Sequence, residues 1–325
     1  MTNKENIEKL ESAFGRLEKN ENVIYFLTYD TKNNARASVK YIYDLALTLK
    51  ENGFNSKILV EDKTYIGVED WLGETYKDLE IVSIKDDNIN INIDDTIVVP
   101  EYYNNTLQQL SNIKCVKILL VQQKEYVFEN LPIGSRFSDF GFDRIITTTE
   151  SAKKYLLEYF PESIVYIIPP IIEDIFKPSD KLQKPFIAIS VRDRGIQRKI
   201  ISEFYLKFPQ LRWVTFRDMV QMSYEDFATN LRECIVSLWI DDDSTFGTFP
   251  LESMKMGIPV IGLIPNLQPE WLSEHNGLWI ANNNTIVDVM ADFVQNWLED
   301  NINPELYTEM EKTVENYSSI ENFES

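Results

Sequence analysis

Short apolar runs alternate with amphipathic segments along the first half of the chain. Most residues in these runs are apolar, rather than every second residue, which is typical of parallel strands buried on both faces. They lie at residues 23–27, 56–60, 80–84, 96–99, 116–121, 144–147 and 164–168. Helical segments are expected at 3–18, 35–51, 106–111 and 151–159. This order of elements predicts an α/β domain with a parallel sheet.

A second series of the same kind follows. Strands are predicted at 186–191, 212–216, 235–240, 258–263 and 278–280, and helices at 197–207, 224–233, 250–256 and 286–298. Between the two series, residues 169–184 combine prolines with mixed charge, as linkers do. We therefore expect two Rossmann-like domains, 1–170 and 171–325, facing a central cleft. An acidic, helical tail is expected from residue 304 onwards.

One stretch of the second series has the pattern of a ligand-binding unit. Residues 234–263 read CIVSLWIDDDSTFGTFPLESMKMGIPVIGL, two apolar strands that flank a loop and a short helix. Pro250 suits the first turn of that helix, and Gly257 suits its C-terminal cap. Ligands of open α/β sheets bind in such loops, and a helix N-terminus attracts phosphate. Glu252, expected in the first turn, is placed to accept hydrogen bonds from a diol such as ribose, although Glu is also common there for structural reasons.

Four cations, Arg192, Arg194, Arg198 and Lys199, follow the strand that ends at Val191. Such a loop suits a pyrophosphate, because Arg offers bidentate contacts and Lys offers a point charge. A solvated basic loop on an acidic protein is the alternative reading.

Three consecutive aspartates, Asp241, Asp242 and Asp243, raise the question of a metal site, since Mg²⁺ and Mn²⁺ prefer carboxylate ligands. Their place deep in the second series favours a loop whose charges cap the following turn. Neither a metal nor another cofactor is expected.

The run STFGTFPLE (244–252), followed by SMKMGIPVI (253–261), resembles the donor-site signature of retaining family 4 glycosyltransferases, which have the GT-B fold. The match is specific at Gly247, Glu252, Gly257, Pro259 and Val260. Ser244 stands where the family has a first Glu, which faces the donor sugar. The resemblance implies transfer of a sugar, with retention, from a nucleotide-diphosphate sugar held by the second domain. The acceptor, whose identity the sequence does not give, would bind the first.

The same resemblance implies roles for individual residues. Arg192, together with Arg198 or Lys199, would neutralise the leaving diphosphate and form the catalytic set. The donor-binding set would comprise Ser244, Gly247, Thr248, Phe249, Glu252, Phe216 and Arg217, with Gly247 allowing close backbone approach and with Phe216 and Arg217 in a loop beside the nucleobase. Polar residues near strand ends of the first domain are expected on the acceptor side: Asn33, Asn34, Glu101, Gln122 and Gln123.

Composition narrows the possible functions. A net charge of −20 over 325 residues argues against general affinity for nucleic acid or anionic membranes. The single histidine, His275, excludes a His-rich metal site and is expected to be structural. Cys115 and Cys234 are expected to be buried free thiols, without a disulfide framework. The chain has no signal-peptide core and no apolar run of about 20 residues, so the cytoplasm is the expected location.

Two other classes of function are alternatives to a glycosyltransferase. A non-catalytic, glycosyltransferase-like nucleotide-binding or scaffold protein is favoured by Ser244 and by a first loop without glycine, 28–34. A nucleotide-dependent oxidoreductase would need a G-x-G-x-x-G motif after a strand, and the sequence has none.

Overall fold

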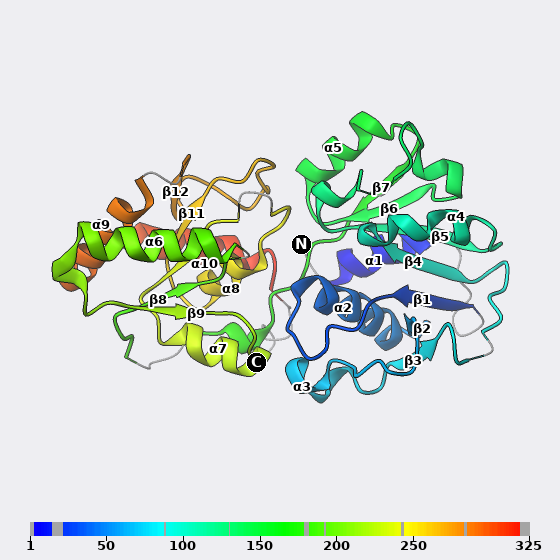
Figure 1. Cartoon of the computed structure of the whole chain (residues 1–325), viewed down its shortest axis with the longest axis horizontal. Helices are drawn as coiled ribbons and strands as arrows, with labels where there is room; N and C mark the ends of the chain where they lie inside the picture. Colours follow the sequence, from blue (N-terminus) through cyan, green and yellow to red (C-terminus); the bar gives the residue numbers. More distant parts are fainter. Residues whose placement is uncertain are drawn as a thin grey trace. The chain divides into compact units, whose positions relative to one another are not determined.

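A computed structural model of the chain describes residues 3–14, 22–87, 89–129, 131–178, 182–191, 193–241, 244–282 and 285–318, without the side chains of 3–5, 104 and 105. The chain divides into two compact units, Met1–Pro170 (unit 1) and Ile171–Ser325 (unit 2) (Figure 1). Each unit contains a parallel sheet with helices.

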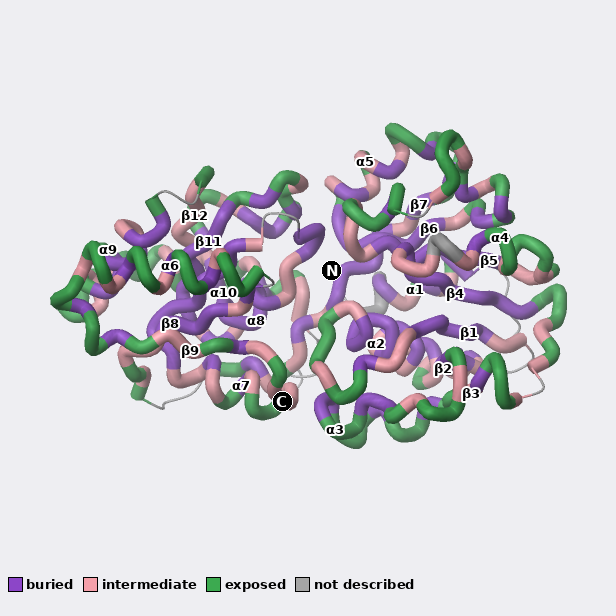
Figure 2. The backbone as a smooth tube through the Cα atoms, in the orientation of Figure 1, coloured by how far each residue is buried: buried purple, intermediate pink, exposed green. Residues whose placement is uncertain are grey.

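Unit 1 is built on a seven-stranded sheet with the order β3-β2-β1-β4-β5-β6-β7, in which all neighbours are parallel. The strands are β1 (Val23–Leu27), β2 (Asn55–Val60), β3 (Glu80–Ser83), β4 (Thr96–Pro100), β5 (Val116–Val121), β6 (Arg144–Thr147) and β7 (Ile164–Ile167). Each end lies within one residue of its predicted run. The central strands β1, β4 and β5 are buried except at the first residues of β1 and β5 (Figure 2), which explains why they are mostly apolar.

The helices of unit 1 are α1 (Asn3–Phe14), α2 (Ala37–Glu51), α3 (Glu69–Leu72), α4 (Leu107–Ser111) and α5 (Glu150–Tyr159). The N-terminal helix α1 packs on the sheet rather than standing apart from it. Its last residue, Phe14, lies 6.1 Å from the ring of Phe26 in β1, and the Arg144 guanidinium donates a 3.0 Å hydrogen bond to the Ala13 carbonyl.

Unit 2 contains a five-stranded parallel sheet with the order β12-β11-β10-β8-β9. Its strands are β8 (Phe186–Ile189), β9 (Thr215–Asp218), β10 (Val236–Trp239), β11 (Val260–Leu263) and β12 (Leu278–Ile280). Its helices are α6 (Arg194–Lys207), α7 (Tyr224–Arg232), α8 (Thr248–Lys255), α9 (Ile286–Leu298) and α10 (Pro304–Glu315).

The sheet of unit 2 is covered on both faces. Alternate residues of each strand point to opposite faces, so Ile187 and Ile189 join one apolar cluster and Ala188 joins another. The first cluster includes residues of α6 and α9, and the second includes residues of α7, α8 and α10. This arrangement is the doubly wound architecture that the two-sided apolar runs predict.

Two element boundaries in unit 2 differ from the sequence prediction. Strand β9 begins at Thr215 rather than at residue 212, because Trp213 is 43% exposed in a turn that follows a 3₁₀ helix, Pro209–Leu211. Helix α6 begins at Arg194 rather than at residue 197. Asp193 caps it, since its Oδ1 accepts hydrogen bonds from the N–H groups of Gly195 (2.7 Å) and Ile196 (3.3 Å).

Part of the predicted linker belongs to unit 2. Phe176 is fully buried, with its ring 5.0 Å from that of Tyr224 and 6.0 Å from that of Phe227. Nearby, the Ile172 N–H donates to the Tyr317 carbonyl at 2.7 Å, which ties the end of α10 to this segment. The predicted helical tail beyond Ser318 lies outside the described residues.

Candidate functional site: the switch point of the unit 2 sheet

The strand order identifies one edge of the unit 2 sheet as the place for a ligand. β8 and β10 are parallel neighbours, and the chain continues from β8 to β9 on one side and from β10 to β11 on the other. In open α/β sheets, ligands bind at the carboxyl ends of the two strands that flank such a switch point. The segment 244–252 follows β10, and Arg192 and helix α6 follow β8. The topology therefore brings the two predicted donor-site segments to one edge.

The loop that enters α8 requires glycine at one position. Gly247 is the N-cap of α8 and has φ +76°, in the left-handed region. A Cβ added there would lie 2.6 Å from Cζ2 of Trp239, the last residue of β10. The Trp239 ring therefore leaves no room for a side chain at this position, and the close backbone approach to a donor that the sequence predicts at Gly247 stays a prediction.

Three tryptophans support the loop that enters α8, and the sequence motif does not predict their contacts. The Trp271 indole N–H donates a 2.7 Å hydrogen bond to the Phe246 carbonyl. The Trp239 ring lies 5.7 Å from that of Trp271 and 6.0 Å from that of Trp279. Residues that position the loop thus come from a segment about 25 residues further on, and pairwise ring packing of this kind leaves no regular spacing in the sequence.

Glu252 lies in the second turn of α8. The prediction of a first-turn position is wrong, because the helix begins at Thr248 and not at Pro250. The residue is 6% exposed, and its Oε1 lies 3.4 Å from the hydroxyl of Tyr224, at the start of α7. A nearly buried carboxyl at this position is an uncommon choice unless it has polar partners.

The N-terminus of α8 presents backbone N–H groups. Thr248 and Phe249 are its first two residues, and no side chain caps them within the described part of the chain. The N–H groups of a first turn have no partner inside the helix. Ser244, just before the helix, is buried, and its N–H donates to the Asp241 carbonyl at 3.3 Å.

The end of α8 follows the sequence prediction. Gly257 has φ +72°, its N–H donates to the Met254 carbonyl, and the Ile258 N–H donates to the Ser253 carbonyl, both at 2.9 Å. These two bonds form a Schellman motif, which fixes the turn into β11.

The predicted basic loop is largely helical. Arg194, Arg198 and Lys199 belong to α6, because the Asp193 cap starts that helix early. Arg194 and Arg198, one turn apart, line a cavity of about 310 Å³ together with Gln197, Ile201 and Ser202.

The three cations of α6 have different surroundings. Arg194 donates to Gln197 (2.8 Å) and pairs with Asp218, whereas Lys199 lies 3.8 Å from Glu203 on its own helix. Arg192 lies outside the described residues.

Phe216 and Arg217 are not in a loop after a strand, as predicted, but inside β9. Phe216 packs at 5.4 Å and 5.6 Å from the rings of Phe204 and Tyr205. Arg217 pairs with Glu233 at 2.9 Å and lies over the ring of Phe186 at 4.2 Å. Both side chains therefore have structural contacts within unit 2.

The aspartate run is described only at Asp241, since Asp242 and Asp243 lie outside the described residues. No group of three or more His, Cys, Asp or Glu side chains that could hold a metal ion occurs among the residues that the structure describes. Both cysteines are free; burial raises the pKa of the Cys234 thiol to about 12, and it also raises the pKa of the half-buried Cys115.

The residues expected on the acceptor side lie near the carboxyl edge of the unit 1 sheet. Asn33, with φ +61°, donates from its side chain to Asp70 (2.9 Å). Asn34 donates to the Thr31 carbonyl (2.9 Å) and thereby closes its own turn. Both amides thus shape the loop between β1 and α2.

Glu101, Gln122 and Gln123 form a connected group at the ends of β4 and β5. Glu101 is 1% exposed, and its Oε1 accepts a 2.8 Å hydrogen bond from the Gln123 N–H. Burial raises the pKa of this carboxyl to about 8. The Gln122 side chain donates to the Ser38 carbonyl at 3.1 Å and so connects β5 to the start of α2. The structure therefore brings these three predicted residues together.

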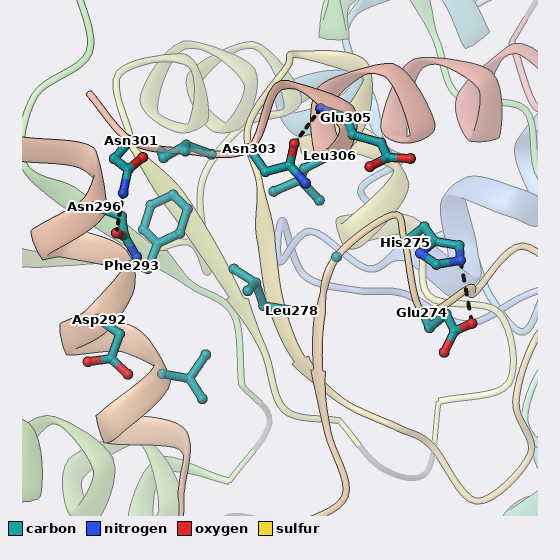
Figure 3. A pocket seen from close by; sticks show the side chains of 13 residues that line it. Glu274, His275, Leu278, Asp292, Phe293, Asn296, Asn301, Asn303, Glu305 and Leu306 are labelled. Atoms are coloured by element: carbon teal, nitrogen blue, oxygen red, sulfur yellow. Dashed lines mark hydrogen bonds and ion pairs between the residues drawn. The ribbon is translucent and has the colours of Figure 1, made fainter. Parts of the chain in front are cut away.

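A cavity of about 510 Å³ in unit 2 contains none of the predicted site residues. It lies where β12 begins, against α9 and the start of α10, and its lining includes Glu274, His275, Asp292, Phe293 and Leu306 (Figure 3). That is the amino-terminal edge of the strand, opposite to the edge at which ligands of such sheets bind. His275, expected to be structural, is 66% exposed there, beside Glu274.

Several solved structures are similar to this chain over most of its length. A sucrose-phosphate synthase (tll1590) from Thermosynechococcus elongatus matches with a TM-score of 0.63 and 13% identity over 92% of this chain and 95% of that one. The pneumococcal O-GlcNAc transferase GtfA matches with a TM-score of 0.62 and 10% identity over 92% and 96%. These similarities show that the chain has the GT-B fold, as predicted.

In sequence, the chain is similar to an alpha-1,6-glucosyltransferase of Actinobacillus pleuropneumoniae serotype 7 (strain AP76), with 23% identity over 259 residues, which are 78% of this chain and 72% of that protein. No family model matches the chain. Among the described residues, no helix is both long enough and apolar enough to cross a membrane.

Proposed function

We propose that this protein is a glycosyltransferase that uses a nucleotide-diphosphate sugar as donor. The GT-B fold and the similarity to a glucosyltransferase support the class. The observation that supports it most at the level of residues is the nearly buried carboxyl of Glu252, one turn into α8 and beside the switch point of the unit 2 sheet. The two hydroxyl groups of a ribose can both donate hydrogen bonds to a carboxylate in this position.

The donor site would combine three kinds of contact in unit 2. Glu252 would accept hydrogen bonds from the ribose, and the N–H groups of Thr248 and Phe249 would face phosphate oxygens. Arg192 and Arg198 would balance the charge that grows on the leaving diphosphate in the transition state. Arg198 suits this role better than Lys199, since it lines the same cavity as Arg194.

The reaction would proceed with retention and without a metal ion. The bond between the anomeric carbon and the diphosphate breaks while the acceptor oxygen bonds to that carbon from the same face. The acceptor proton passes to an oxygen of the leaving phosphate, so no histidine base is needed. Unit 1 would bind the acceptor.

The direct test is consumption of sugar nucleotides. Two similar solved proteins, GtfA and Anabaena Alr3699/HepE, were crystallised with UDP or UDP-glucose, so UDP-sugars are tried first, followed by GDP- and ADP-sugars. We expect one of them to raise the melting temperature and to release its nucleoside diphosphate slowly in water, faster with a glycan acceptor. Donor binding without release of nucleoside diphosphate would favour the non-catalytic alternative. Ser244, which stands where the family has Glu, points to the same alternative. If no donor binds and none releases its nucleoside diphosphate, the proposal is refuted.

A further inference from the structure

Asn276 lies at the centre of a buried network of hydrogen bonds in unit 2. The residue is 0% exposed and belongs to the turn before β12. Its side-chain oxygen accepts from the Ser273 N–H (3.1 Å) and from the Trp279 indole N–H (3.0 Å). Its side-chain nitrogen donates to the Trp271 carbonyl (2.7 Å) and to the Thr313 hydroxyl (3.0 Å). An asparagine amide has two donors and two acceptor sites, so all four are used and one orientation of the amide satisfies them.

Trp271 extends this network to the loop that enters α8. Its buried indole N–H donates a 2.7 Å hydrogen bond to the Phe246 carbonyl. That carbonyl belongs to the same planar peptide unit as the N–H of Gly247, the N-cap of α8, so a bond that fixes one of them also fixes the other. Gly247 has no Cβ to restrict its own backbone angles. The Trp271 bond therefore holds a peptide plane that the glycine by itself leaves free to rotate.

The other end of the network lies in α10. The Thr313 hydroxyl accepts from Asn276 and donates to the Glu309 carbonyl (2.7 Å), one turn earlier in the same helix. α10 also packs against α8, since Val314 belongs to the same buried apolar cluster as Leu251. α10 thus contributes a polar contact as well as an apolar face to the surroundings of the α8 loop.

We propose that Asn276 is a positioning residue of the donor site. By holding Trp271 against the Phe246 carbonyl, it fixes the directions of the N–H groups at the start of α8, and Thr313 makes this arrangement depend on α10. The inference rests on the proposed function, because those N–H groups are the ones proposed to face phosphate oxygens. In this role Asn276 acts through the loop and not on the nucleotide itself.

The formation of a turn does not by itself account for the bonds of Asn276. Asparagine stabilises turns through neighbouring backbone groups, as in its bond from the Ser273 N–H. The bond to Thr313 spans 37 residues, and the bond from Trp271 to Phe246 spans a further 25. A polar network whose members are all satisfied specifies a single arrangement. N–H groups that are already ordered bind a phosphate without a further loss of entropy, so loosening them should weaken binding.

Two measurements on the full chain test this proposal. Hydrogen exchange without ligand reports the order of the loop, in a peptide that covers residues 244–251. Calorimetric titration reports the affinity for UDP, GDP or ADP, whichever binds the wild type. Asn276→Ala would remove all four hydrogen bonds at once and can prevent folding. Trp271→Phe and Thr313→Val are used instead, because each removes one bond of the network.

Trp271→Phe keeps a ring in the core but removes the N–H that holds the Phe246 carbonyl. It should speed exchange of the 244–251 peptide and weaken nucleotide binding three- to tenfold, the loss of about one hydrogen bond. Thr313→Val should weaken binding two- to fivefold, whereas Thr313→Ser, which keeps the hydroxyl, should bind as the wild type does. Because both lesions affect one chain of contacts, the double variant should weaken binding by less than the product of the two single effects.

Tyr205→Phe is the matched control. It also removes a donor to a backbone carbonyl, that of Val214 at 2.7 Å, but Tyr205 lies near the end of α6 and outside the network. This variant should lose stability in denaturant as Trp271→Phe does, yet it should change neither the exchange of the 244–251 peptide nor the affinity for nucleotide.

The outcomes separate this inference from the proposed function. The inference is wrong, while the proposed function survives, if a nucleotide binds and Trp271→Phe and Thr313→Val leave its affinity or the exchange of the loop unchanged. It is equally wrong if Tyr205→Phe weakens binding as much as they do, or if the two single effects multiply in the double variant. If UDP, GDP and ADP all fail to bind the wild type, the proposed function falls and the inference falls with it.

Discussion

Glu252 offers the sharpest test at the scale of a single residue. Glu252→Gln keeps the size of the side chain but removes the charge that would strengthen hydrogen bonds from a ribose. Such bonds contribute roughly 1.5–3 kcal/mol, so nucleoside diphosphate affinity should fall about ten- to hundredfold in calorimetric titration. Because the ribose does not react, most of the loss should appear in affinity rather than in the chemical step.

Tyr224→Phe is the control for that experiment. It removes the hydroxyl 3.4 Å from Glu252 but leaves the carboxylate, so nucleotide affinity should change little. Both variants should melt close to the wild type. Unchanged nucleotide affinity in Glu252→Gln would show that the carboxyl serves only the packing of α8.

Glu101 should make the stability of the protein depend on pH. Its pKa is about 8 in the folded chain and about 4.3 in an unfolded one, so between these values the folded state holds a proton that the unfolded state has released. The free energy of unfolding should therefore fall as pH rises from about 5 to 8, by up to about 1.4 kcal/mol per pH unit, and this contribution should level off above pH 8. Urea unfolding of Glu101→Gln should lack that contribution. Equal slopes in both proteins would mean that Glu101 is already ionised at pH 5–6.

The entry to α8 carries the prediction at the scale of an element. Gly247→Ala places a Cβ at positive φ and 2.6 Å from Trp239, whereas Gly257→Ala has a similar φ of +72° and no heavy atom within 4 Å. Both should lose about 1–2 kcal/mol of unfolding free energy for the backbone conformation. Gly247→Ala should lose roughly 1–3 kcal/mol more for the clash. If denaturant unfolding shows the same loss of unfolding free energy in both variants, the Trp239 contact does not determine the conformation of this loop.

Elements were predictable from the sequence where burial alone determines them. The strands of unit 1 follow their apolar runs, because a strand covered on both faces consists mostly of apolar residues. Boundaries set by single side chains were missed: Asp193 starts α6 early, and exposed Trp213 made residues 212–214 resemble a strand. The sequence predicts the wrong turn for Glu252, because Pro250 suits any position of the first helical turn and does not mark the first residue of α8. The contacts of Trp239, Trp271 and Trp279 that support the α8 loop could not be predicted, because these residues are distant in sequence and contact one another only in the folded chain.

Metal dependence is a prediction at the scale of the whole molecule. If arginines balance the charge of the leaving diphosphate, turnover of the sugar nucleotide should survive EDTA within about twofold, and Arg198→Ala should lower turnover as well as affinity. Lys199→Ala, one residue along α6 but directed toward Glu203, is the matched control and should change neither. Activity that EDTA abolishes and Mn²⁺ restores would place a metal in this chemistry.

The presence of two parallel sheets is predictable from the sequence as two βα series. The positions of polar residues at strand ends were visible as well. The sequence does not show which of those residues come together, because that depends on the strand order. β1 lies beside β4, and β8 lies beside β10. Phe216 and Arg217, which the sequence placed in a donor loop, lie inside β9 with structural partners.

We expect a nucleoside diphosphate to bind at the carboxyl ends of β8 and β10. Hydrogen exchange of the intact protein, with and without saturating UDP (or GDP or ADP, whichever binds), tests it directly. Peptides that cover residues 190–200 and 241–256 should exchange more slowly with nucleotide, while those around the 510 Å³ cavity, 274–306, should not change. Protection confined to 274–306, or to unit 1, would show that the nucleotide does not bind at this edge of the unit 2 sheet.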